Sequence, residues 1–162
     1  MFQTLWKLRE GFLTGAGILI VGFALQFSVG PIDWTAFAFP VNVFFLIFYL
    51  LTLVVIYVLR HRVRLFAFFF TVEAAVPTLL YATILTIAMG LTRQVAPHER
   101  AIDPLGLTRM LSFWPFVLIY ARLTGIVGLI ALRQIHHFKL REVPSMLSHI
   151  GLFTALVSPT LG

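Results

Sequence analysis

The sequence predicts an all-α integral membrane protein, a polytopic bundle of about five transmembrane helices, and three observations carry this prediction. Of the 162 residues, 60% are hydrophobic and only 11% are charged, whereas roughly a quarter of the residues of a soluble domain are charged. The chain contains five apolar stretches close to the ~20 residues that cross a hydrocarbon core of ~30 Å. Basic residues concentrate in alternate connections between these stretches. Together these features exclude an ordinary soluble enzyme, a coiled coil and a disordered tail.

The five expected spans form a single transmembrane domain over residues 1–162, and they cover residues 11–29, 36–59, 65–91, 111–132 and 144–162. The first carries no charge, and the second is dense in Phe, Leu, Val and Ile. The third contains one charge, Glu73, and the fourth contains one, Arg122. The fifth is barely long enough to cross. Helices are expected because an isolated strand leaves its backbone unsatisfied in lipid, and these runs are apolar on every face.

The connections predict the orientation of the spans. One side of the membrane receives eight basic residues, namely Lys7, Arg9, Arg60, Arg62, Arg64, Arg133, Lys139 and Arg141. The other side receives three, namely Arg93, Arg100 and Arg109. By the positive-inside rule the amino terminus is cytoplasmic and the carboxyl terminus periplasmic. The first span is expected to be a retained helix, because its apolar run is longer than that of a signal peptide.

The charge balance and the motif content exclude several function classes. The net charge of +6 follows mainly from the topology, so it predicts contact with anionic lipid rather than with nucleic acid. The chain has no cysteine, which excludes disulfides, thiolate metal sites and a cysteine nucleophile. It also has no phosphate-binding loop, no dinucleotide fingerprint and no hydrolase or metalloprotease motif. We therefore assign no catalytic residue.

Three polar residues lie where lipid tolerates them poorly. Counted from the cytoplasmic ends of their spans at ~1.5 Å per residue, Glu73, Arg122 and His149 are expected roughly 12, 16 and 8 Å deep. A charge in the membrane interior costs at least ~2.5 kcal/mol, which makes each residue a functional candidate. Glu73 and Arg122 are candidates for an ion pair between the third and fourth helices. Alternatively, Arg122 extends its guanidinium toward an interface, or it binds a carboxylate or propionate while Glu73 relays protons.

His149 has two interpretations. It either hydrogen-bonds within the bundle or ligates a cofactor. Glycines permit close approach between helices and occur in the first and fourth spans, at Gly11, Gly15, Gly17, Gly22, Gly125 and Gly128. Proline disrupts helix geometry, and Pro40, Pro77 and Pro115 lie within or near spans.

Several strings taken together carry a family resemblance. They are WKLREGFLTGAGILIVGFALQ, FAFPVNVFFLIF, IAMGLTRQV, DPLGLTRMLSFWPFVLIYARLTGIVGLIALRQI and SMLSHIGLFTALVSPTLG. The set resembles the ResB-type (CcsB-type) membrane subunits of System II cytochrome c biogenesis. The most diagnostic part is the His-x-Gly at His149 and Gly151. Members of that family continue into a large external domain, which these 162 residues do not contain.

The resemblance implies a function and a cofactor. It implies a bacterial inner-membrane subunit that holds or passes haem, with His149 as an axial ligand of the haem iron. It further implies a CcsA-like partner subunit and an apocytochrome c or multihaem reductase as recipient, within a haem-lyase complex. We add Arg122 as a candidate partner of a haem propionate, independently of the resemblance.

Two alternatives to haem handling come from other functional classes. The first is a quinone-reactive membrane anchor of a respiratory complex, in which Glu73 or His98 would handle the proton. The second is a structural or transport protein in which Glu73 and Arg122 clamp two helices together.

Overall fold

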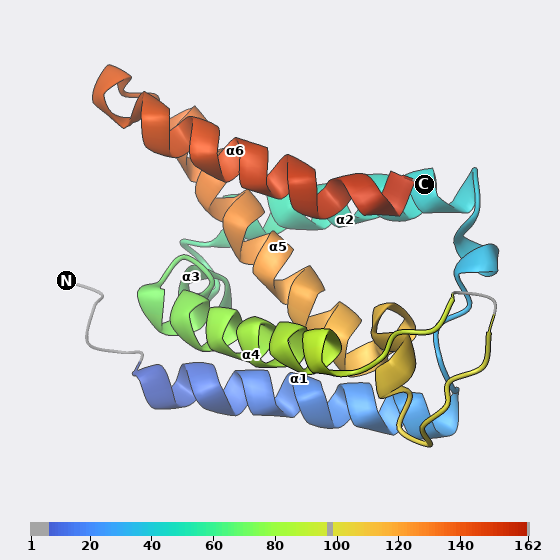
Figure 1. The fold of residues 1–162 in the computed structure, drawn as a ribbon. Helices are drawn as coiled ribbons and strands as arrows, with labels where there is room; N and C mark the ends of the chain where they lie inside the picture. Colours follow the sequence, from blue (N-terminus) through green and yellow to red (C-terminus); the bar gives the residue numbers. More distant parts are fainter. Residues whose placement is uncertain (1–6, 97–98, 162) are drawn as a thin grey trace. The chain divides into compact units, whose positions relative to one another are not determined.

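The computed structural model describes residues 7–96 and 99–161, with side chains through Pro159, and all of the regular structure in these ranges is helical. The α-helices are α1 (Leu8–Ser28), α2 (Val41–Leu59), α3 (Arg64–Phe68), α4 (Val72–Leu91), α5 (Trp114–His136) and α6 (Val143–Val157) (Figure 1). Short 3-10 helices lie at Trp34–Phe37, Leu107–Ser112, Leu140–Glu142 and Ser158–Leu161. The all-α prediction is confirmed for the described residues.

Four of these helices, α1, α2, α4 and α5, are long and apolar enough to cross a membrane. Many large hydrophobic side chains on them are exposed, among them Phe48, which is 70% exposed on α2. A water-soluble protein rarely exposes so much contiguous apolar surface, whereas lipid solvates it without cost. The fold therefore indicates a multi-pass membrane protein. The fifth expected span corresponds to α6, whose 15 residues extend about 22 Å. That α6 crosses the membrane stays a prediction.

The third expected span, residues 65–91, differs from the structure because the chain turns between α3 and α4. The Ala74 N–H donates to Thr71 Oγ1 at 3.3 Å, and Thr71 Oγ1 donates to the Phe68 carbonyl at 2.7 Å. A threonine that caps a helix in this way favours a new helix start over continuation of the preceding helix. Glu73 is consequently the second residue of α4 and lies in its first turn, not eight residues into a continuous span.

Proline sets the starts of two other helices. The residue before a proline disfavours helical geometry, and α2 begins directly after Pro40, at Val41 rather than at residue 36. Pro115 is the second residue of α5, a first-turn position where its missing N–H would have no intrahelical partner. α5 therefore covers Trp114–His136 in place of the expected 111–132. Pro77 lies inside α4 and is fully buried.

The contacts divide the chain into two compact units. The first comprises Met1–Trp34 and Val76–Leu123, and the second comprises Thr35–Ala75 and Thr124–Gly162. The first unit thus holds α1, most of α4 and the start of α5. The second holds α2, α3, α6 and the end of α5. Each unit is described separately below.

In the first unit, glycines let α1 approach its neighbours. A Cβ on Gly15 would lie 2.6 Å from Cδ2 of Tyr81 on α4, and Tyr81 Oη donates to the Phe12 carbonyl at 3.0 Å. A Cβ on Gly22 would lie 2.7 Å from Cα of Pro115. Close approach of this kind replaces the hydrophobic effect as the source of helix association in lipid. A buried apolar cluster of Met110, Phe113 and Phe116 completes the packing of this unit.

In the second unit, the glycines of α5 accommodate side chains from α2 and α6. A Cβ on Gly128 would lie 2.9 Å from Leu53 Cδ1 and 2.6 Å from Phe153 Cε2. A Cβ on Gly125 would lie 3.2 Å from the Tyr49 hydroxyl. The expected role of small residues in helix approach is therefore observed at Gly125 and Gly128 on this helix.

Candidate functional site

His149 lies in the second unit, on α6, and its imidazole is held by its own helix. Nδ1 is 2.8 Å from the Ser145 carbonyl oxygen, one turn earlier. A carbonyl only accepts hydrogen bonds, so Nδ1 carries the proton and donates it. In a neutral imidazole the other nitrogen, Nε2, then keeps its lone pair. The ring is half-buried, and Nε2 makes no hydrogen bond within the described part of the chain.

A polar path connects this histidine to α5. Gln134 Nε2 donates to Ser145 Oγ at 3.1 Å, and Ser145 Oγ lies 3.5 Å from His149 Nδ1. Gln134 Oε1 is buried and accepts no hydrogen bond from the described residues. Gln134 and Ser145 were not among the site residues predicted from the sequence. The spacing of Ser145 and His149, one helical turn apart, was the signal that could have identified the pair.

This geometry can supply one ligand to a metal. Histidines that ligate metals commonly donate their second ring N–H to a carbonyl or carboxylate, which orients the ring and fixes its tautomer. The described residues contain no group of three or more His, Cys, Asp or Glu side chains able to hold a metal ion. A single histidine nitrogen can fill one ligand position of a metal whose remaining ligands come from elsewhere.

Arg122 lies in the first unit and is buried, with 8% of its surface exposed. Its Nη2 donates to Thr14 Oγ1 on α1 at 2.9 Å. This bond links α5 to α1 within the unit, and it is of the stronger, charge-assisted type. The depth of burial is unlike that of an arginine whose guanidinium extends into an interface. A role for Arg122 toward a propionate stays a prediction.

Glu73 lies in the second unit, in the first turn of α4. A carboxylate in this position interacts favourably with the positive end of the helix dipole. Because Glu73 and Arg122 belong to different units, their expected ion pair stays a prediction. Arg9 pairs with Glu10 and Lys139 pairs with Glu142, and each pair has at least one exposed side chain. His98, the alternative proton-handling residue, lies outside the described residues.

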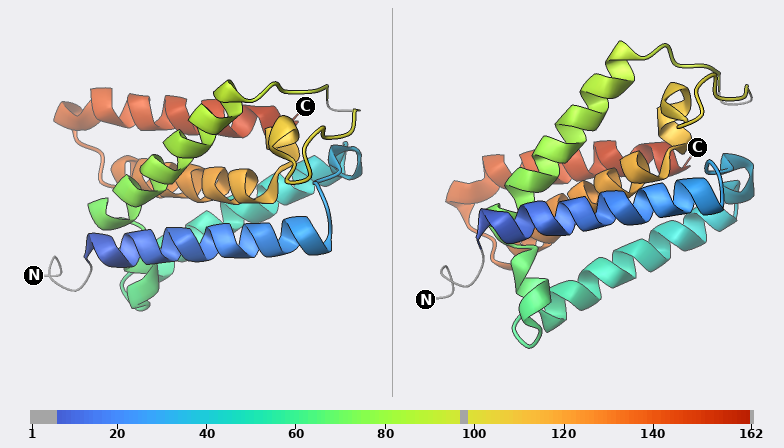
Figure 2. Two further views of the ribbon diagram at one scale, coloured as in Figure 1. Left: turned by 60° about the horizontal axis from the view of Figure 1, so that its bottom comes forward. Right: turned by 90° about the horizontal axis from the view of Figure 1, so that it is seen from below.

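Hydrogen bonds hold residues 102–108, which belong to the connection from α4 to α5 that Figure 2 traces. The Asp103 carboxylate accepts from Leu107 N–H at 2.7 Å, from Thr108 N–H at 2.8 Å and from Thr108 Oγ1 at 2.6 Å. Desolvation would raise the pKa of Asp103, but these hydrogen bonds outweigh it and lower the pKa to about 2. Gly106, with φ of +85°, completes the turn in a conformation that favours glycine.

Glutamine and tryptophan side chains fasten this connection to the rest of the first unit. Gln94 Nε2 donates to the Leu107 carbonyl at 3.0 Å, and Gln94 Oε1 accepts from Met110 N–H at 3.0 Å. The Trp114 indole N–H donates to the Gly30 carbonyl at 2.8 Å, and Trp34 donates to the Leu111 carbonyl at 3.1 Å. These bonds join the connection and the start of α5 to the segment that follows α1.

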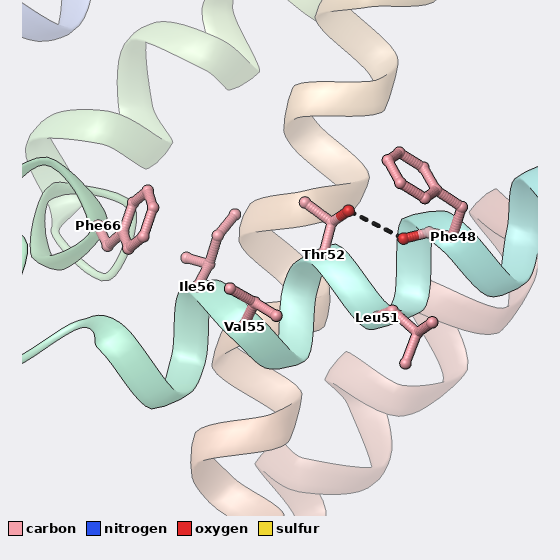
Figure 3. Close-up of a pocket in the computed structure, with 6 residues that line it drawn as sticks. All are labelled: Phe48, Leu51, Thr52, Val55, Ile56 and Phe66. Atoms are coloured by element: carbon pink, nitrogen blue, oxygen red, sulfur yellow. Dashed lines mark hydrogen bonds between the residues drawn. The ribbon is translucent and has the colours of Figure 1, made fainter.

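An apolar groove of about 340 Å³ lies in the second unit along the outer face of α2 (Figure 3). It is lined by Phe48, Leu51, Thr52, Val55, Ile56 and Phe66. The hydroxyl of Thr52 donates to the Phe48 carbonyl at 2.8 Å, so the groove offers no free polar group from this residue. A second groove of about 190 Å³ lies between α2 and α6 and includes Phe153, one turn beyond His149. Neither groove contains His149 among its lining residues.

Comparison of the chain with models of known protein families, with curated proteins and with solved structures gave no match.

Proposed function

We propose that the chain is a haem-handling membrane subunit of cytochrome c biogenesis, resident in the bacterial inner membrane with its amino terminus in the cytoplasm. The observation that carries the proposal is the hydrogen bond from His149 Nδ1–H to the Ser145 carbonyl, which leaves Nε2 as the ring nitrogen with a lone pair. The resemblance to ResB-type subunits supports the same histidine independently.

In this proposal each residue of the site has a defined task. His149 would hold the haem iron through Nε2, and the Ser145 carbonyl keeps the ring in orientation by accepting the hydrogen bond from Nδ1. Gln134 fixes the Ser145 side chain from α5. Bound haem would supply a redox-active iron and the vinyl groups to which c-type cytochromes attach their thiols. Because the chain offers one histidine at this site, a CcsA-like partner subunit would supply the second ligand and an apocytochrome c would receive the haem.

Haem binding by the purified chain tests the proposal. Haemin titrated into the protein in detergent micelles should give a Soret band that reports binding. The affinity of the chain for haemin should fall at least about tenfold in His149→Ala. The variant Ser148→Ala is the matched control, because it removes a hydroxyl from the same helix that, among the described residues, bonds only the Pro144 carbonyl and takes no part in the site. His137→Ala, at an exposed histidine, is a second control. Both controls should bind haem as the unaltered chain does. Equal haem binding by His149→Ala and the unaltered chain would contradict the proposal.

A further inference from the structure

A cluster of cations and aromatic rings lies in the second unit at the carboxyl ends of α2 and α5. It consists of Tyr57, Arg60, Phe70, Arg133 and His136, and we refer to it as the Arg60–Arg133 cluster. The guanidinium carbon of Arg60 lies 3.9 Å from the Tyr57 ring centroid and 5.9 Å from that of Phe70. The guanidinium carbon of Arg133 lies 6.0 Å from the same Phe70 ring. One aromatic ring thus holds two arginines from two different helices.

The cluster is rich in donors and has no acidic partner among the described residues. The described ion pairs involve neither Arg60 nor Arg133. Arg60 donates one N–H of its guanidinium to the Tyr57 carbonyl at 2.7 Å, and its other N–H groups remain available as donors. The Tyr57 hydroxyl is buried and has no hydrogen-bond partner within the described residues. The remaining N–H donors of the two guanidinium groups and the Tyr57 hydroxyl match the several oxygens of a phosphate group.

The surroundings favour a lipid as the source of that phosphate. α2 and α5 are two of the four helices long and apolar enough to cross a membrane, and we expect the ends of such helices at headgroup level. The apolar groove on α2 ends at Ile56, one helical turn before Arg60. The segment that contains Phe66, which lines the groove, also contributes Phe70 to the cluster. An acyl chain in the groove and a phosphate at the arginines would therefore belong to one molecule.

We propose that the Arg60–Arg133 cluster and the adjacent groove bind an anionic phospholipid, with the phosphate held by the two arginines and the Tyr57 hydroxyl. Charge complementarity selects an anionic headgroup, because the cluster offers cations without carboxylates. This site is separate from His149 and does not depend on haem binding.

Native mass spectrometry of the full chain with phosphatidylglycerol tests the proposal. Replacing both arginines, Arg60→Gln with Arg133→Gln, should lower the fraction of chains that retain this lipid by about tenfold or more. The matched control is Arg62→Gln with Arg64→Gln, which removes the same charge from exposed neighbouring arginines that lie outside the cluster. The control should change retention less than about twofold, and retention of neutral phosphatidylcholine should be equal in all forms.

Two single substitutions and a competition with inorganic phosphate test the site further. Arg133→Lys keeps the charge and removes the planar fork, and Tyr57→Phe keeps the ring and removes the hydroxyl. Each should weaken phosphatidylglycerol retention while the unfolding midpoint stays near that of the unaltered chain. Equal losses of phosphatidylglycerol retention in the two double variants would mean that the lipid is attracted by the net positive charge of the surface, and this result would overturn the proposed site. Inorganic phosphate that displaces the lipid at equal concentration would show that the acyl chain adds nothing, and would overturn the assignment to a lipid.

Discussion

Alanine at Gly22 is expected to destabilise the first unit severely. The new Cβ would lie 2.7 Å from Cα and 2.8 Å from the nitrogen of Pro115, atoms of the main chain that cannot rotate away. Overpacking of this kind costs about 1–3 kcal/mol in well-packed interiors, and contact with backbone on a proline favours the upper end of that range. The measurement is the thermal unfolding midpoint of the chain in detergent, followed by circular dichroism.

Gly17 provides the matched control on the same helix. A Cβ at Gly17 would meet no atom within 4 Å. Alanine there should leave the midpoint unchanged or raise it slightly, because alanine is the better helix former by about 0.5–1 kcal/mol. If the two variants unfolded at the same temperature, the close approach of α1 to the start of α5 would be contradicted.

Asn at Asp103 is the second substitution with a large expected effect. The carboxylate accepts three hydrogen bonds, from two backbone N–H groups and the Thr108 hydroxyl. Hydrogen bonds to a charged group contribute about 1.5–3 kcal/mol each in favourable cases, and an amide retains one acceptor oxygen. Hydrogen exchange should therefore show faster opening of the Leu107 and Thr108 amides in Asp103→Asn. The exposed Glu99→Gln is the control and should leave both amides protected as before.

The same carboxylate makes the connection sensitive to acid. The pKa of Asp103 is about 2 in the folded chain, below its ordinary value of 3.8, because the hydrogen bonds favour the charged form. Its stabilisation is therefore fully present above about pH 4 and is lost as the pH falls toward 2. Protection of Leu107 and Thr108, corrected for the intrinsic exchange rate, should fall in this window. Asp103→Asn should show no such fall, and an identical acid response in both forms would refute the assignment.

Four long apolar helices, α1, α2, α4 and α5, could be predicted from composition, because a membrane span needs about 20 apolar residues however the helices pack. Their boundaries depended on local chemistry that hydropathy does not report. Thr71 caps α4 and thereby moves Glu73 to a helix end, and Pro115 starts α5 rather than kinking it. Threonine can lie inside a helix or cap its start, and proline can kink a helix or begin one. The sequence shows both residues, but tertiary packing decides which role each takes.

The glycines illustrate what the sequence could not provide. Gly17 and Gly22 have similar sequence surroundings on the same helix. A Cβ on Gly17 would meet no atom within 4 Å, whereas a Cβ on Gly22 would meet the Pro115 backbone. Which face of a helix meets a neighbour is a property of the assembled unit. Similarly, Thr14 as the partner of Arg122 lies 108 positions away in the chain. In contrast, the bond from His149 to Ser145 spans a single helical turn and was within reach of sequence reasoning.

The central claim is that His149 offers Nε2 as an iron ligand, and rescue of His149→Gly by free imidazole tests it most directly. The glycine variant should bind haem weakly, and added imidazole should restore the Soret and visible bands of the unaltered chain by occupying the vacated position. His137→Gly, treated identically, should show no effect of imidazole. Haem binding by His149→Gly that equals that of the unaltered chain before any imidazole is added would contradict the claim.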